Sequence, residues 1–415
     1  STPRRPVEDR RFVAGRGKFI ADLDRPNMLH VAPLASHHAA AVINGIDASA
    51  ALAMPGVVDV ITGAELAAAV QPLMNGLNTP NVRRFPLAFD RVRYAGEWVC
   101  AVVAESRALA EDALEKIIVD ATPQPFILDA EAALLETSAP VHPEHGSNLL
   151  LDRKFVWGPV DDDFDAAAHS LSFSVTWGRN STVPIETFGV LAEWNGWDQM
   201  LDIWASIQMP KYADQIARSL DLPGNAIRVH YDVDVGGSYG VKRGIKHSVL
   251  VGYIARKLGC PVRLIEDRLE NMRAGDAHGP ERKFDITIAF DQDGTVRSMK
   301  MRALDNAGAY AGRAPFQLGK PISAIVGPYQ INSVAYHALS VTTNKTVQEA
   351  VRGFGQAPTN YAIETAMDRV AEYLGMDRLA LRQKNLIRKD QFPYLIPSGS
   401  YYDSGDYHAV IDKVL

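Results

Sequence analysis

Cysteine is scarce in this sequence, because only Cys100 and Cys260 occur among its 415 residues. Two isolated thiols cannot hold an iron–sulfur cluster or a cysteine-rich zinc site, so we expect neither centre in this chain. Each cysteine lies in an apolar, strand-like stretch, which predicts a small buried hydrophobe. Reduced thiols also fit a cytoplasmic location.

Long apolar runs are missing as well. The longest, residues 39–43 and 248–255, are far shorter than a membrane span, and residues 1–6 contain no apolar region typical of a secretory signal. Neither sign of charge dominates, since 43 Lys and Arg are balanced by 49 Asp and Glu. The basic residues are scattered, whereas nucleic-acid binders usually show a basic stripe. We therefore expect neither a membrane span nor a nucleic-acid partner.

The remaining composition is that of a globular protein, with 47% hydrophobic and 22% charged residues. The length indicates two or three domains. We divide the chain into an α/β domain over residues 1–120, a linker rich in proline and glycine over 121–150, and a mixed α/β domain over 151–415. This organisation predicts the α+β fold class.

Periodicity and turn residues predict the individual elements. Strands are expected over residues 29–32, 57–62, 98–104, 117–119, 172–177, 200–205 and 227–235, with a hairpin over 284–303. Helices are expected over residues 46–52, 106–116, 242–258, 358–374 and 377–387, and one more is expected to open at Pro210.

The strongest local feature is the glycine-rich stretch that follows the expected strand 227–235. It contains Gly236, Gly237 and Gly240, and the next helix is expected to carry Lys242 and Arg243 at its start. Glycines let the backbone approach a ligand, and the free N–H groups of a helix start suit an anion such as phosphate. The spacing is neither Gly-x-Gly-x-x-Gly nor a Walker loop, which counts against a nicotinamide dehydrogenase. A plain tight turn is the alternative.

Two further stretches could contribute to a site. Arg352 and Phe354 lie in a segment with two glycines, where they could orient and stack a flat ligand, although an ordinary loop is an equal alternative. Gln208 follows a strand and precedes a helix, where its amide could cap the helix or donate a hydrogen bond to an oxyanion or metal-oxo group.

Other groups are interpreted as structural. Asp232 and Asp234 could share one face of a strand, but no third metal ligand accompanies them. His142 and His145 lie in a proline-bearing loop, where a metal site is the less favoured interpretation.

Taken in order, these segments resemble the molybdenum-binding large subunit of the xanthine dehydrogenase/aldehyde oxidase family of molybdenum hydroxylases. Residues 8–19, 54–60 and 92–99 resemble the family's α/β-hammerhead domain, and the rest resembles its first molybdopterin-binding domain. The resemblance covers nearly the whole chain and implies this pair of domains.

The resemblance also implies roles for single residues. Gln208 matches the glutamine that hydrogen-bonds the apical oxygen of the molybdenum centre. Tyr239 and Gly240 match an aromatic–glycine pair whose backbone meets the metal and pterin, with Gly236 and Gly237 giving clearance.

The arginine-bearing segment takes further roles from the resemblance. Arg352 matches the arginine whose backbone lies beside the metal, so it joins Gln208 at the reacting centre. Phe354 matches an aromatic that packs against a flat substrate, and Ala350 is expected nearby. Gly353 stands where copper-containing carbon monoxide dehydrogenases have a cysteine, which disfavours that branch.

The substrate-binding positions depart from the purine-oxidising members. Arg243 stands where they have a glutamate, and an ungapped count places Lys320 where they have an arginine. These two residues are therefore expected to line the substrate pocket, and a basic pocket wall suggests an anionic or carbonyl-bearing substrate.

The family's catalytic base is a glutamate in a Gly-x-Gly-Glu segment, and this sequence contains no such segment. Residues 401–415 resemble the junction that precedes the second molybdenum domain, where nicotinate dehydrogenase divides its large subunit into two chains. A naturally split subunit is the favoured interpretation, and a fragment of a longer chain is the alternative. The base is then expected on a partner chain.

The resemblance implies a multi-subunit enzyme that hydroxylates an N-heterocycle or an aldehyde with oxygen from water. Hydride passes to the molybdenum centre, and electrons leave through [2Fe-2S] clusters. The implied cofactor of this chain is molybdopterin cytosine dinucleotide. An iron–sulfur small subunit, an FAD-bearing medium subunit and the second molybdenum-domain chain are the expected partners. The alternative function is a non-catalytic scaffold or cofactor-insertion protein with the same fold.

Overall fold

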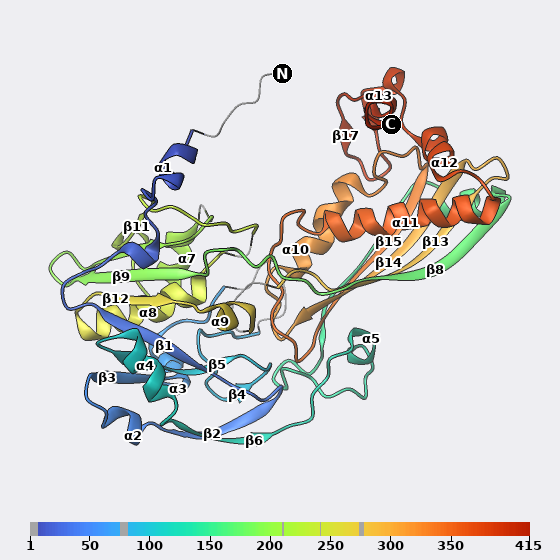
Figure 1. Ribbon diagram of the computed structural model, residues 1–415. Coiled ribbons are helices and arrows are strands. Elements are labelled where there is room, and N and C mark those ends of the chain that lie inside the picture. The colour runs from blue at the N-terminus through green and yellow to red at the C-terminus, as the bar shows by residue number, and fades with distance from the viewer. Residues whose placement is uncertain (1–6, 75–81, 210, 241, 274–277) are drawn as a thin grey trace.

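In the computed structural model, the described residues are 7–74, 82–209, 211–240, 242–273 and 278–415. They form two lobes, each built on one large β-sheet (Figure 1). The fold combines helices with mixed sheets, which confirms the predicted α+β class. Within the described ranges, no helix is both long enough and apolar enough to cross a membrane.

The first lobe contains a seven-stranded sheet in the order β11-β10-β9-β12-β1-β5-β3. Its strands are β1 (Leu29–Ala35), β3 (Val57–Thr62), β5 (Trp98–Ala104), β9 (Gly189–Asn195), β10 (Met200–Ala205), β11 (Ile227–His230) and β12 (Val262–Ile265). β1 pairs in parallel with β12, so strands from both sides of the linker share one sheet. Every residue of β5 is buried, as its continuous apolar sequence predicts.

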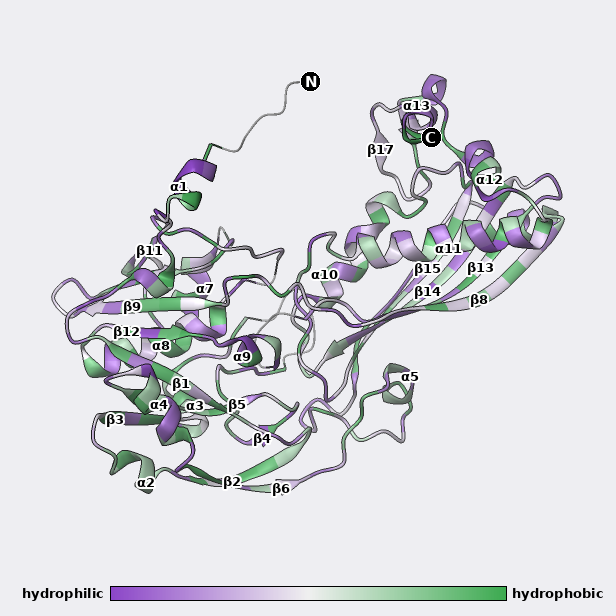
Figure 2. Ribbon diagram, in the orientation of Figure 1, coloured by the Kyte–Doolittle hydropathy of each residue, from purple (hydrophilic) through white to green (hydrophobic). Residues whose placement is uncertain are grey.

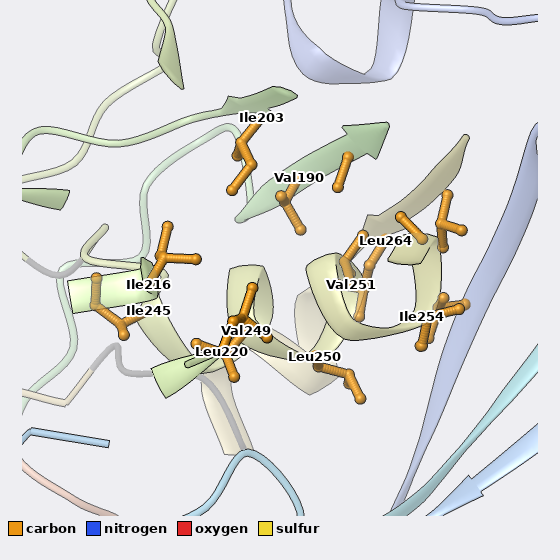
Figure 3. Packing of buried hydrophobic residues seen from close by; sticks show 14 of the residues in the cluster. Val190, Ile203, Ile216, Leu220, Ile245, Val249, Leu250, Val251, Ile254 and Leu264 are labelled. Atoms are coloured by element: carbon orange, nitrogen blue, oxygen red, sulfur yellow. The ribbon is translucent and has the colours of Figure 1, made fainter. Parts of the chain in front are cut away.

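Helices α7 (Tyr212–Ser219) and α8 (Ile245–Leu258) pack against this sheet (Figure 3). Val249, Val251 and Ile254 of α8 meet Val190 and Ile203 of the sheet in one buried cluster. This helix therefore has a largely buried surface, which fixes the segment that precedes it.

Helix α4 (Arg107–Leu114) packs on β1 and β5, next to α2 (Ser49–Leu52), while α3 (Gly63–Ala69) packs on β3. A small sheet in the order β4-β2-β6 joins β2 (Ala41–Asp47), β4 (Arg91–Val92) and β6 (Ile118–Pro123).

The second lobe contains a five-stranded sheet in the order β7-β15-β14-β13-β8. Its strands are β7 (Leu149–Trp157), β8 (His169–Trp177), β13 (Arg282–Phe290), β14 (Val296–Gly308) and β15 (Ser333–Thr342). The long helix α11 (Gln356–Leu374) crosses one face and buries its apolar side there, while its polar side faces outward (Figure 2).

The other elements are short. They are the helices α1 (Asp9–Val13), α5 (Ala130–Ala133), α6 (Val160–Ala166), α9 (Arg268–Arg273), α10 (Ala314–Gly319), α12 (Arg378–Asn385) and α13 (Tyr407–Val414), the 3-10 helices η1 (Ile20–Asp22), η2 (Gly224–Ala226), η3 (Lys320–Ala324) and η4 (Lys389–Gln391), and the strands β16 (Tyr394–Leu395) and β17 (Tyr401–Tyr402).

Most predicted elements are confirmed, and three need correction. The helix expected over 46–52 begins at Ser49, because Ile46 and Asp47 belong to β2. The strand expected over 227–235 ends at His230, and the helix expected over 242–258 begins at Ile245. The predicted helix-opening residue Pro210 lies outside the described residues, although α7 follows it.

A buried polar network joins the two lobes at the linker. His142 lies with its Nε2 2.6 Å from the carbonyl oxygen of Ala309, so this nitrogen must donate and Nδ1 accepts from Arg93 Nε at 3.2 Å. Tyr310 donates its hydroxyl hydrogen to Glu97 at 2.6 Å. Burial, reinforced by the Arg93 charge, lowers the pKa of His142 to about 4. The imidazole is therefore a neutral, fully partnered group, which agrees with a structural role.

This network predicts acid sensitivity. The unfolded histidine titrates near 6.5 and the folded one near 4, so the stability that neutral His142 contributes is present above pH 6.5 and is lost as pH falls toward 4. Between pH 7.5 and pH 5 this amounts to about 2 kcal/mol. We expect His142→Gln, which keeps one donor and one acceptor, to remove that share of the pH dependence in urea unfolding. His145→Gln in the same loop is the control, and an unchanged pH dependence in His142→Gln would contradict the prediction.

Candidate cofactor-binding site

Three segments that lie far apart in the sequence meet between the two lobes. The Arg352 N–H donates to the carbonyl oxygen of Tyr239 at 2.6 Å, and the Gln208 N–H donates to the carbonyl oxygen of Lys242 at 3.3 Å. Gly240 lies directly against the backbone of Ala350, where a Cβ would be 2.8 Å from the carbonyl carbon and closer still to its oxygen. The structure thus brings together the segments that contain Gln208, the glycine-rich turn and Arg352.

Left-handed backbone angles shape the glycine-rich turn. Gly237 and Gly240 have φ values of 92° and 112°, and Tyr239 has a φ of 57°, which is unusual for a residue with a side chain. Gly244, with a φ of 59°, precedes α8, and a Cβ there would overlap the ring of Phe188. The left-handed Gly244 is the physical reason why the helix begins at Ile245 and not at Lys242.

The side chain of Glu186 fixes the glycine-rich turn through hydrogen bonds. Its carboxylate accepts from the Gly236 N–H at 2.7 Å and from Lys242 Nζ at 2.6 Å. Lys242 is buried, and burial lowers its pKa although the Glu186 pair opposes the shift. The charge of Lys242 is therefore directed inward at a carboxylate. The prediction that Lys242 stands at the start of the helix is wrong.

The two aspartates before the turn anchor the N-terminal segment. Asp234 accepts from both terminal nitrogens of Arg11, at 2.5 and 2.6 Å, and from the Lys18 N–H at 2.7 Å. Asp232 accepts from Lys18 Nζ at 2.7 Å. The Arg11 guanidinium holds the pKa of Asp234 below its usual value. These pairs confirm the structural interpretation of both aspartates.

The arginine-bearing turn is fixed by α10. A Cβ on Gly355 would be 2.7 Å from the carbonyl carbon of Gln317, and the Gln317 side chain donates to the carbonyl oxygen of Glu349 at 3.2 Å. Phe354 has a positive φ of 33°. The Arg352 guanidinium lies 5.1 Å from the centre of the Tyr239 ring, a cation–π distance that links the two turns a second time.

Several side chains of these turns remain exposed. Tyr239 is 42% exposed, and both Gln208 and Arg352 are exposed. Among the described residues, none makes a hydrogen bond with the side-chain amide of Gln208. An available amide, a guanidinium and glycine backbone without side chains suit a large anionic cofactor that accepts hydrogen bonds. The residues present therefore fit a pterin carrying phosphate and a metal-oxo group.

The two predicted basic pocket residues differ in their surroundings. Arg243 Nη1 lies 2.8 and 3.0 Å from the two carboxylate oxygens of Glu349, so its charge is neutralised. Lys320 is exposed at the junction of α10 and η3, and its ammonium group makes no hydrogen bond or ion pair with a described residue. The place of Lys320 in the substrate pocket stays a prediction.

The sequence analysis missed Glu186, Gln317 and Glu349. Glu349 directly precedes Ala350, and an acidic residue next to a predicted site residue was the available signal. Its partner could not be read from the sequence.

The prediction that the cysteines are small buried residues is confirmed for Cys100. It is buried, and burial raises the pKa of its thiol to about 12. Cys260 is half-buried. In the part of the chain that the structure describes, His, Cys, Asp and Glu side chains do not gather in threes that could hold a metal ion.

Comparison with known proteins agrees with this geometry. Residues 14–125 match the aldehyde oxidase and xanthine dehydrogenase a/b hammerhead domain, and residues 141–386 match the molybdopterin cofactor-binding domain. The nicotine 6-hydroxylase large subunit of Paenarthrobacter nicotinovorans is 33% identical over 98% of this chain and 50% of its own. Subunit gamma of the 6-hydroxypseudooxynicotine dehydrogenase complex of the same organism is 32% identical over 96% of this chain and 52% of its own.

A solved structure also matches this chain over nearly its whole length. Quinoline 2-oxidoreductase from Pseudomonas putida 86 superposes with a TM-score of 0.90 at 33% identity, over 98% of this chain and 52% of that one. The chain spans about half the length of the relatives it matches. It belongs to the xanthine dehydrogenase/aldehyde oxidase family of molybdenum hydroxylases, as a molybdopterin-binding part of the large subunit.

Proposed function

We propose that this chain is the cofactor-binding part of a multi-subunit hydroxylase that oxidises an electron-poor carbon of an N-heterocycle, with an aldehyde as the second substrate class. The main support is the direct contact between the turns, in which the Arg352 N–H donates to Tyr239 at 2.6 Å. The names of the similar nicotine 6-hydroxylase and quinoline 2-oxidoreductase favour the heterocycle.

The cofactor would be held by Gln208, by the backbone of Gly236, Gly237, Tyr239 and Gly240, and by Arg352. When bound, a molybdenum cofactor, here proposed as the molybdopterin cytosine dinucleotide, supplies the two-electron redox chemistry with oxygen from water. The chain itself binds, orients and stabilises charge.

Each exposed residue has a distinct task in this proposal. The Gln208 amide donates a hydrogen bond to negative charge at the reacting centre, and it needs no rearrangement because no described residue binds it first. The Arg352 N–H is already used by Tyr239, so this residue acts by fixing the turn and by its guanidinium charge. Phe354 and Ala350 pack against a flat substrate.

The remaining functions are assigned to partners. The proton-accepting glutamate is proposed to come from the second molybdenum-domain chain, which corresponds to the half of the relatives' length that this chain does not span. Electrons would leave to an iron–sulfur small subunit and an FAD-bearing medium subunit, because two cysteines cannot ligate a cluster here.

The decisive experiment is purification of the chain with its partner subunits. We expect molybdenum and a cytosine-dinucleotide pterin in the complex, and ¹⁸O from labelled water in the hydroxylated heterocycle. An active preparation without molybdenum, or a product whose oxygen derives from O₂, would overturn the proposal.

Phe354 provides a separate test of substrate stacking. We expect Phe354→Ala to raise KM for a heteroaromatic substrate about tenfold, because an aromatic contact of about 1.4 kcal/mol is lost. Phe354→Leu, which keeps the apolar volume, is the matched control and should retain part of the affinity. Steady-state kinetics would check this, and an unchanged KM in both variants would exclude stacking on this ring.

A further inference from the structure

We infer that Arg243 and Glu349 form an internal ion pair whose task is to position Gln208 and Ala350, so that Arg243 acts as a positioning residue and not as the cation that binds substrate. This inference rests on the proposed function, because it concerns the geometry of the same site.

The ion pair is connected to all three converging segments. Arg243 belongs to the glycine-rich segment, and its Nη1 donates to both oxygens of Glu349 at 2.8 and 3.0 Å. Its Nε lies 3.2 Å from the sulfur of Met209, the residue next to Gln208. Glu349 is in turn the residue next to Ala350. The Arg243 guanidinium thus contacts the side chains of Met209 and Glu349. These residues belong to the two other segments, and each is the sequence neighbour of a predicted site residue.

Glu349 is also fixed through its own backbone. Its N–H donates to the carbonyl oxygen of His278 at 2.7 Å, and its carbonyl oxygen accepts from Gln317 at 3.2 Å. A carboxylate on a segment held at both its N–H and its carbonyl oxygen can set the place of Arg243, and the reverse is less effective because Arg243 has a long side chain with several rotatable bonds.

Both side chains of the pair are largely buried, so loss of one partner should have a large energetic cost. The Arg243 side chain is 13% exposed and that of Glu349 only 2%. Breaking such a pair on one side leaves a charge without its partner, whereas removal of both charges together is much less harmful. The effects of the two substitutions should therefore be strongly non-additive.

The surrounding charges make the two substitutions unequal. Arg84 and Lys246 line the same small cavity as Arg243 and Glu349, and repulsion from Arg243 adds to burial in lowering the pKa of Arg313. Among the described residues that line this cavity, Glu349 is the carboxylate and Arg84, Arg243 and Lys246 are the cations. Loss of Arg243 leaves Glu349 in a cavity that Arg84 and Lys246 also line, whereas loss of Glu349 removes the carboxylate that Arg243 binds. Glu349→Gln should be the more damaging change.

The test is a double-mutant cycle in the complete complex, using Arg243→Met, Glu349→Gln and both together. Displacement of Gln208 by about 1 Å is enough for a hundredfold loss of rate, so we expect kcat to fall about a hundredfold in Glu349→Gln and about tenfold in Arg243→Met. The double variant should be no worse than Arg243→Met. KM should stay within about twofold throughout, because no substrate contact is removed.

A matched control exists in the second lobe. Arg382 Nε pairs with Glu364 at 2.7 Å between α12 and α11, with side chains 21% and 42% exposed. Arg382→Met and Glu364→Gln should leave kcat unchanged. The molybdenum content of every variant and its thermal unfolding midpoint separate a displaced site from a lost cofactor or a lost fold. Arg243→Lys and Glu349→Asp, which keep the charges, should recover part of the rate.

Each contrary result has a definite meaning. An increase in KM in Arg243→Met with kcat unchanged would make Arg243 a substrate-binding cation and would overturn the inference. Additive losses, or equal losses in the control pair, would also overturn it. Failure of the wild-type complex to contain molybdenum would refute the proposed function instead, so the two failures are distinguishable.

Discussion

Gly240→Ala is expected to leave the purified complex with less than a tenth of its molybdenum and with a correspondingly reduced rate. The new Cβ would lie 2.8 Å from the carbonyl carbon of Ala350 and nearer to its oxygen, and both atoms are backbone atoms that cannot rotate away. Either the glycine-rich turn or the Arg352 turn must move, and the hydrogen bond from the Arg352 N–H to Tyr239 is strained with it. Metal analysis and the pterin content of the complex measure the effect.

The control separates this clash from the cost of a left-handed backbone. Gly259 also has a positive φ, of 66°, but a Cβ there would meet nothing within 4 Å. Gly259→Ala should therefore cost only the conformational strain of about 1 kcal/mol and should keep its molybdenum. Equal metal contents in the two variants would show that the contact between the turns does not matter for cofactor binding.

Gln208→Ala is expected to lower kcat about a hundredfold while the complex keeps its cofactor and its stability. The amide is exposed and no described residue hydrogen-bonds it, so its loss leaves no buried group without a partner. The loss of one preorganised donor at a centre that develops negative charge has this magnitude in other enzymes. Single-turnover reduction of the complex by substrate would isolate the step.

Gln208→Glu is the informative companion, because it keeps the size of the side chain but replaces the donor with an acceptor. It should be at least as slow as Gln208→Ala. Full activity in Gln208→Ala and Phe354→Ala would instead favour the alternative function, in which the chain is a scaffold or a cofactor-insertion protein.

The sequence was informative wherever one local property decided the structure. β5 could be predicted because all of its residues are apolar, and α11 because its apolar residues recur at helical spacing. The glycine-rich segment could be predicted as a turn because glycine tolerates the left-handed angles that Gly237 and Gly240 adopt.

Long-range partners could not be predicted. The boundary at Lys242 was misplaced because burial against Glu186 and the packing of Gly244 on Phe188 override local helix propensity. The ion pair between Arg243 and Glu349 could not be predicted, because nothing in the sequence places these two residues side by side. Gln208 and Arg352 entered through their resemblance to a family, and local pattern alone left their roles open.

The parallel pairing of β1 with β12 has a consequence for how the chain is made. Leu29 opposes Val262, so β1 gains its second neighbour only after most of the first lobe has left the ribosome. A polypeptide truncated at the linker would carry an unpaired, apolar strand edge, which is a template for aggregation. Attempts to produce the hammerhead region by itself should therefore yield inclusion bodies, and co-production with the rest of the chain should prevent them.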